Sequence, residues 1–117
     1  ARVTLASLDS ERSFALEELF DGFKSLKIDK EIVLGFEILL KRGRFYYRKV
    51  GARERLNITK LSLVVFRSQE SYRVSGASLN AYVKRFKSIE KLLERGAFSE
   101  EELLECMGKD VKPHSTA

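Results

Sequence analysis

The sequence predicts an α+β fold in which helices pack on one face of an antiparallel four-stranded sheet, in the order α-β-β-β-β-α-α. Three observations favour it: apolar residues recur at helical spacing near the N-terminus, alternate with a period of two through the middle, and form a long helical stripe over residues 78–95. With 117 residues, 44% of them hydrophobic, the chain is expected to form a single domain, 1–117. We expect the segment 1–7 and the tail 109–117 to be mobile.

The first predicted element is a helix whose free amides Asp9 or Ser10 can cap. Its outer face is acidic, so it would repel phosphate. Its apolar positions recur at helical spacing and are Leu16, Leu19, Phe20, Phe23 and Leu26.

Residues 32–40 are predicted to form the first strand, because every even position is large and apolar. A helix with Ile32, Phe36 and Leu39 on one face remains an alternative. Arg42 and Gly43 then supply a turn into a second strand, 44–50. The alternating positions of the first strand are Ile32, Leu34, Phe36, Ile38 and Leu40.

The predicted strand 44–50 separates its side chains onto two faces. A second turn at 51–53 leads to a branched and aromatic strand, 56–66, whose alternation slips near Lys60, and a short fourth strand covers 72–74. Within strand 44–50 one face carries Arg44, Tyr46 and Arg48, and the other carries Phe45, Tyr47 and Lys49.

Two helices are predicted to complete the fold. The first spans 78–95, with Ser78 as its N-cap and Gly96 as a left-handed C-cap. Its apolar stripe consists of Leu79, Tyr82, Val83, Phe86, Ile89 and Leu93. The second is short and ends near Met107; Ser99 and Glu102 form a capping box before it, and Phe98 and Leu103 stand where a hydrophobic staple packs.

Positive charge is concentrated between Lys41 and Lys60, which hold eight of the twenty-two basic residues against one acid, Glu54. Aromatic residues lie within this basic strip. Cations displace counterions from phosphates and rings stack on bases, so the pattern favours a nucleic-acid-binding domain that prefers single-stranded or unpaired DNA or RNA, with little sequence specificity. The predicted contacts are Arg42, Arg44, Tyr46, Arg48, Lys49, Arg53, Arg55, Lys60, Phe66, Tyr72 and Arg73.

Two other interpretations remain open for the basic strip. It can be a solvated charged hairpin with aromatic residues in its core, because charge runs commonly form plain surface. The chain can also be a protein-interaction or assembly module, whose acidic helices dock against basic surfaces, including the strip of a neighbouring copy. A gel shift with a short oligonucleotide separates nucleic-acid binding from this module.

Catalysis is not predicted. The single histidine, His114, lies in the tail beside Pro113, and Cys106 stands among acids that would raise its pKa. One cysteine and one histidine cannot supply four zinc ligands, and phosphate-loop and dinucleotide motifs are absent from the sequence. We therefore expect a binding protein that is not an enzyme and has no metal, cofactor or small-molecule substrate.

Neither a membrane partner nor an exported location is predicted. The longest apolar stretches, 32–40 and 61–66, are far shorter than the ~20 residues that cross a bilayer. The first seven residues lack the features of a secretory signal. A single cysteine excludes an internal disulfide and suits a reducing intracellular compartment, the cytoplasm or nucleus, with an organelle not excluded.

The run Gly76-Ala77-Ser78-Leu79-Asn80, followed by Val83, Phe86 and Leu93, resembles the positive-cofactor-four (Sub1-like) family of transcriptional coactivators over about residues 32–95. The resemblance implies a curved four-stranded sheet, a homodimer that grips single-stranded DNA, and a base-stacking role for Phe66. Val74 and Ser75 replace the basic pair that the family places before the glycine, and the family's core domain lacks the predicted first helix.

Overall fold

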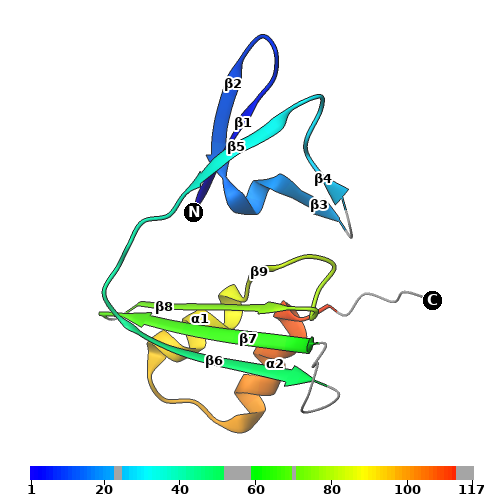
Figure 1. Cartoon of the computed structure of the whole chain (residues 1–117). Coiled ribbons are helices and arrows are strands. Elements are labelled where there is room, and N and C mark those ends of the chain that lie inside the picture. Colours follow the sequence, from blue (N-terminus) through cyan, green and yellow to red (C-terminus); the bar gives the residue numbers. More distant parts are fainter. Residues whose placement is uncertain (23–24, 52–58, 70, 113–117) are drawn as a thin grey trace, which may run out of the picture. The chain divides into compact units, whose positions relative to one another are not determined.

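The computed structural model describes residues 1–22, 25–51, 59–69 and 71–112. The chain divides into two compact units, Ala1–Lys41 and Arg42–Ala117 (Figure 1). Among the described residues, no helix is both long and apolar enough to cross a membrane. The sequence was expected to form a single domain, whereas in the structure each unit has a core cluster of its own.

The α+β class is confirmed: the sheets are antiparallel, and the described residues contain two α-helices. The prediction of one four-stranded sheet in the order α-β-β-β-β-α-α is wrong. The described strands form three sheets, of three, two and four strands. The discrepancy lies mainly in the first unit, where strands replace the predicted N-terminal helix.

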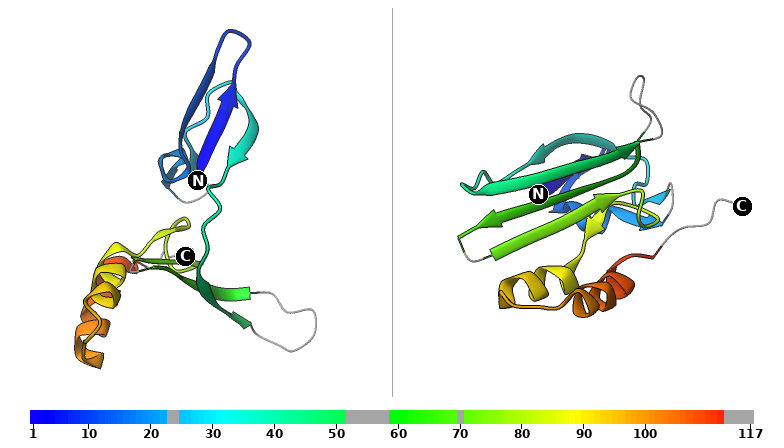
Figure 2. Two further views of the ribbon diagram at one scale, coloured as in Figure 1. Left: turned by 90° about the vertical axis from the view of Figure 1, so that its left-hand side faces the viewer. Right: turned by 90° about the horizontal axis from the view of Figure 1, so that it is seen from below.

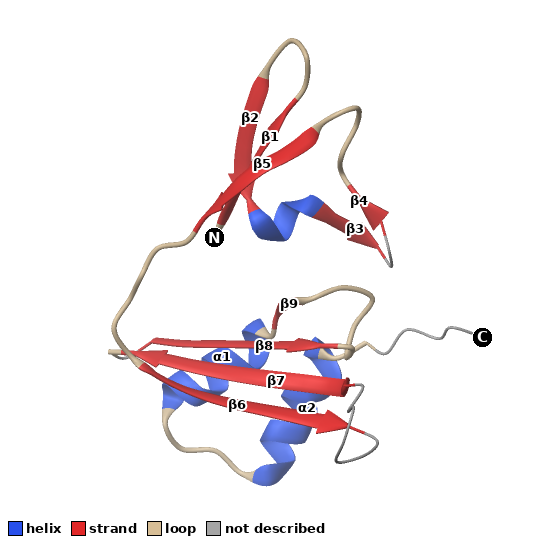
Figure 3. Ribbon diagram, viewed as in Figure 1, coloured by secondary structure: helices blue, strands red, loops and turns tan. Residues whose placement is uncertain are grey.

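A three-stranded sheet dominates the first unit (Figure 3). It is formed by β1 (Arg2–Ala6), β2 (Glu11–Ala15) and β5 (Ile32–Glu37), with β1 in the centre. Val3 and Leu5 of β1 are fully buried. Residues 1–7, which were expected to be mobile, therefore contain the central strand of this unit.

The predicted first helix is wrong because its proposed capping residues form a hairpin turn instead. The amide of Ser7 donates to the carbonyl of Ser10 at 2.9 Å, and the Ser7 hydroxyl accepts the amides of Asp9 and Ser10. β2 then pairs with β1, and a short 3-10 helix, η1 (Leu16–Leu19), leads to the paired strands β3 (Phe20–Gly22) and β4 (Ser25–Leu26). Phe23 lies outside the described residues.

Three of the apolar residues assigned to that helix nevertheless contribute to the core. Leu19 is buried against Val3 and Leu5, and Leu16 and Phe20 pack around it. The short 3-10 helix η1 places Leu16 and Leu19 against Val3 and Leu5 of the sheet. Leu26, which was assigned to the same apolar face, is exposed.

The strand interpretation of residues 32–40 is confirmed in β5, which pairs with β1 and ends at Glu37. The register shifts between Thr4 and Leu5, so Leu34 is an extra residue in the ladder. Arg42 and Gly43 do not join β5 to the following strand as a hairpin, because that strand belongs to the second unit.

The second unit contains a four-stranded sheet with both helices on one face (Figure 2). The strands, in their order across the sheet, are β6 (Arg44–Gly51), β7 (Thr59–Ser68), β8 (Ser71–Ala77) and β9 (Lys84–Arg85). Helices α1 (Lys87–Arg95) and α2 (Glu100–Asp110) follow. The core between sheet and helices is built on buried Val74, Phe86 and Ile89.

The predicted helix over 78–95 begins too early. Ser78 has a φ of 65°, a left-handed conformation that cannot start a helix. Lys84 instead pairs with Gly76 in the sheet, and the Ser75 hydroxyl donates to the Lys84 carbonyl at 3.0 Å. Only Lys87–Arg95 is helical, and it ends at Gly96 with a φ of 87°, as the C-cap prediction requires.

The prediction for α2 is confirmed at its start. The Ser99 hydroxyl accepts the amide of Glu102 at 3.2 Å. The helix extends past Met107 to Asp110, so the first two residues of the expected mobile tail are helical. Residues 113–117, which include His114, lie outside the described residues.

Candidate interaction surfaces

The basic strand β6 has the two-faced arrangement that its alternation predicts. Tyr46 pairs with Val65 and Arg48 pairs with Leu63 in the neighbouring strand. Cross-strand partners share a face, and Val65 and Leu63 pack toward the helices. Arg44, Tyr46 and Arg48 therefore lie on the helix side of the sheet, where they remain exposed because β6 is an edge strand.

Other predicted contact residues lie on the opposite face. Phe66 pairs with Phe45 on one side and with Arg73 on the other, and Lys49 pairs with Ser62. Tyr72 pairs with Arg67 on the helix side, and the Arg67 guanidinium lies 5.7 Å from the Tyr72 ring. The predicted nucleic-acid contacts are thus divided between two faces of one sheet.

The remaining predicted contacts add little to either face. Arg42 precedes β6, and its carbonyl accepts the Ser68 hydroxyl at 3.0 Å. Arg53 and Arg55 lie outside the described residues, as does the side chain of Lys60. The predicted contact residues that the structure describes therefore do not form a single surface.

On the face of this sheet opposite the helices lies an aromatic surface, which we call the aromatic face. It consists of Phe45, Tyr47, Val64 and Phe66. Phe45 is 75% exposed and Tyr47 57% exposed, whereas Val64 and Phe66 are half-buried. Such exposed rings resemble the anchors of protein interfaces, where aromatic residues are enriched.

The first unit has an apolar surface of its own, which we call the apolar edge: Ile32, Val33, Leu34 and Phe36 of β5, with the following Ile38, Leu39 and Leu40. Ile32 is 66% exposed and Phe36 is 59% exposed. The alternation of residues 32–40 predicted a strand but not an exposed surface. The available signal was a nine-residue apolar run that contains one charge, Glu37.

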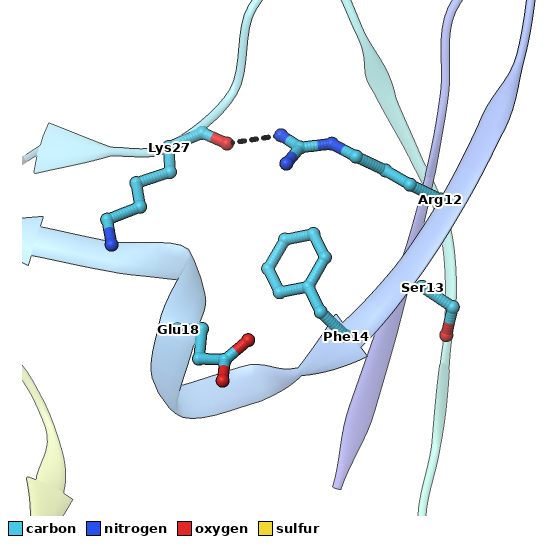
Figure 4. Close-up of a pocket in the computed structure, with 5 residues that line it drawn as sticks. All are labelled: Arg12, Ser13, Phe14, Glu18 and Lys27. Carbon is cyan, nitrogen blue, oxygen red and sulfur yellow. Dashed lines mark hydrogen bonds between the residues drawn. The ribbon is translucent and has the colours of Figure 1, made fainter.

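The first unit also has an open depression of about 590 Å³, lined by Arg12, Ser13, Phe14, Glu18 and Lys27 (Figure 4). The Arg12 guanidinium lies 4.9 Å from the Phe14 ring and donates to the Lys27 carbonyl at 2.8 Å. It also makes a bidentate contact with Glu31, with both distances 2.8 Å. This hydrogen bonding lowers the pKa of Glu31 below its usual value. Arg12 thus braces strand β2 against the segment after β4.

The described residues contain no group of three or more His, Cys, Asp or Glu side chains that could hold a metal ion. Cys106 is half-buried and packs against the core of the second unit. Large exposed apolar side chains lie on the aromatic face and the apolar edge.

Comparison with known proteins gives fold-level matches. No protein-family model and no curated protein matches the sequence. Quinoline 2-oxidoreductase from Pseudomonas putida 86 has a similar structure, with a TM-score of 0.77 at 14% sequence identity. A carbon monoxide dehydrogenase from Hydrogenophaga pseudoflava, which lacks the Mo-pyranopterin moiety of the molybdenum cofactor, gives a TM-score of 0.71 at 16% identity. Each match covers 97% of this chain and 43% of the other, so this chain spans less than half the length of either.

These matches correct the functional prediction. Three predictions are wrong, because the fold of nearly the whole chain occurs in oxidoreductases. They are nucleic-acid binding, a role in transcription regulation, and a homodimer with a nucleic-acid partner. The division of the predicted contacts between two faces agrees with this correction. The resemblance to the Sub1-like family remains a prediction from sequence.

Proposed function

We propose that the chain is part of an oxidoreductase subunit and that it contributes protein contacts rather than reacting groups. The observation that carries the proposal is the match of 97% of the chain to 43% of two longer oxidoreductase chains. Both units are included in that coverage. In this proposal, the activity belongs to a larger protein of which these residues form one portion.

The exposed apolar surfaces support a role in protein contact. The apolar edge of the first unit and the aromatic face of the second unit both expose large apolar side chains. The hydrophobic effect favours the burial of such side chains, and large exposed apolar patches mark contact sites. Complete burial of a fully exposed apolar side chain contributes about 1.5–3 kcal/mol, and burial of the part that is still exposed here contributes correspondingly less. Contact with further protein would supply this burial.

The proposal includes no reaction step for this chain. The described residues contain no group of three or more His, Cys, Asp or Glu side chains that could hold a metal ion. We place the redox centre of the proposed oxidoreductase in its other parts.

Purification of the native protein under non-denaturing conditions tests the proposal. We expect the purified material to contain protein beyond this 13.4 kDa chain and to absorb visible light, with an absorbance that dithionite changes. The 117-residue chain purified alone is the matched control and should be colourless. A colourless native protein without redox-dependent absorbance would overturn the proposal.

A further inference from the structure

We propose that the outer edge of β5 pairs with an additional β-strand, supplied by the part of the oxidoreductase subunit that lies outside these 117 residues. The inference rests on the proposed function and adds a specific mode of contact to it. β5 lies at one edge of the three-stranded sheet, whose order is β2-β1-β5. One side of β5 pairs with β1, and no strand of the described residues pairs with the other side.

The composition of β5 suits the interior of a sheet rather than its edge. Exposed edges are usually protected by charges, prolines or very short strands, because unpaired backbone groups attract other strands. β5 has six residues, no proline and a single charge, Glu37. The bulge at Leu34 is a partial protection, but the ladder with β1 continues on both sides of it.

Both faces of β5 carry exposed apolar side chains. Phe36 pairs with buried Val3, so it lies on the core face, whereas Ile32 pairs with Ala6. Val33, which pairs with buried Leu5, is also exposed. Apolar residues on both faces are typical of strands that are covered on both sides in the complete protein.

The opposite edge of the same sheet provides a contrast. In β2, Glu11, Arg12 and Ser13 are exposed polar residues, and Arg12 is engaged by Glu31. This edge has the charges that discourage further pairing. The two edges therefore differ in charge, and of the two only the β5 edge is suited to pairing with a further strand.

The occupant that the comparisons favour is the remainder of a longer subunit. The matched oxidoreductase chains contain more than twice the length that this chain covers, so additional polypeptide is available in proteins of this fold. An extended segment with alternating apolar residues would fit. Its backbone would complete the hydrogen bonds of β5, and its side chains would cover those of Ile32 and Phe36.

Hydrogen–deuterium exchange distinguishes strand pairing from simple coverage of side chains. We expect the outward-facing amides of β5 to exchange at least tenfold more slowly in the native protein than in the 117-residue chain, because pairing protects them. The amides of β2 provide the internal control and should exchange equally in both. Ile32→Asp in the native protein should remove most of the β5 protection, whereas Leu8→Asp, at a fully exposed apolar position of the same unit, should leave it unchanged.

The outcomes separate the inference from the proposed function. A native protein with redox-dependent absorbance and unprotected β5 amides would overturn strand pairing and leave the proposed function standing. A colourless native protein without additional polypeptide would overturn both. Protection that appears in the isolated chain as its concentration rises would assign the edge to a second copy and overturn the inference.

Discussion

The carboxylate of Asp110 accepts the backbone amide of Ile89 at 2.8 Å, although the two residues are 21 positions apart. It also accepts the amide of Ser88 at 3.2 Å. Phe86, the residue in the N-cap position of α1, provides no side-chain cap. The last residue of α2 therefore caps the first turn of α1, a position where a negative charge also favours the helix dipole.

Asp110→Ala should lower the free energy of unfolding of the second unit by about 1 kcal/mol, the usual effect of losing a helix cap. Urea denaturation followed by circular dichroism measures the change. Glu105→Ala on the same helix is the control and should stay within about 0.5 kcal/mol, because Glu105 is exposed. Equal effects of the two substitutions would contradict the capping role.

Glu90 provides a second test of the same unit, because it is 4% exposed and accepts the Val74 amide at 2.9 Å. Arg85 donates to its carboxylate at 2.5 and 3.1 Å. Glu90→Ala should cost about 2–3 kcal/mol, since it leaves the buried Val74 amide without its acceptor while partly exposed Arg85 can be hydrated. Lys91→Ala, at the adjacent exposed position, should change stability by at most about 0.5 kcal/mol in the same urea titration.

Gly76 is a packing position. An added Cβ would lie 2.7 Å from the Leu79 side chain and 2.9 Å from the Ser62 carbonyl oxygen. Gly76→Ala should therefore destabilise the second unit by about 1–3 kcal/mol. Gly108→Ala meets nothing within 4 Å in helix α2 and should stabilise it by about 0.5–1 kcal/mol through helix propensity. If thermal unfolding moves in the same direction for both variants, the packing explanation is wrong.

The stability of the first unit should fall in acid through Glu31. Its pKa is held below the ordinary 4.5, first by the hydrogen bond from Arg12, so folding is favoured while Glu31 is ionised. This contribution is present above pH 4.5 and is lost as the pH falls through the lowered pKa. The stability difference between the wild type and Glu31→Gln, measured by urea denaturation, should therefore shrink between pH 6 and pH 3. A constant difference would show that Glu31 is not responsible.

Local signals in the sequence were sufficient for parts of the second unit. The Ser99–Glu102 cap and the Gly96 C-cap depend on neighbouring residues, and the alternation of residues 44–50 predicts strand β6. Long-range pairing was not predictable from these signals. The partner of β5 is β1, a short strand of five residues whose alternating Val3 and Leu5 give only a weak pattern.

The site was less predictable than the fold, for the same physical reason. The high count of basic residues revealed the basic strip, but the direction in which each face of β6 points depends on the register with β7. The helical stripe over 78–95 suggested one helix, whereas pairing of Lys84 with Gly76 displaces its start to Lys87. The exposure of the apolar edge depends on which strand is left at the border of a sheet, and sequence periodicity does not contain that information.

We propose that further protein of an oxidoreductase covers the apolar edge and the aromatic face. Hydroxyl-radical footprinting of Phe36 and Tyr47, which are 59% and 57% exposed in the chain, tests this coverage directly. We predict that both side chains are modified at least fivefold more slowly in the native protein than in the isolated 117-residue chain, whereas fully exposed Leu8 reacts equally in both. Equal modification of Phe36 and Tyr47 in the two samples would show that neither surface is covered.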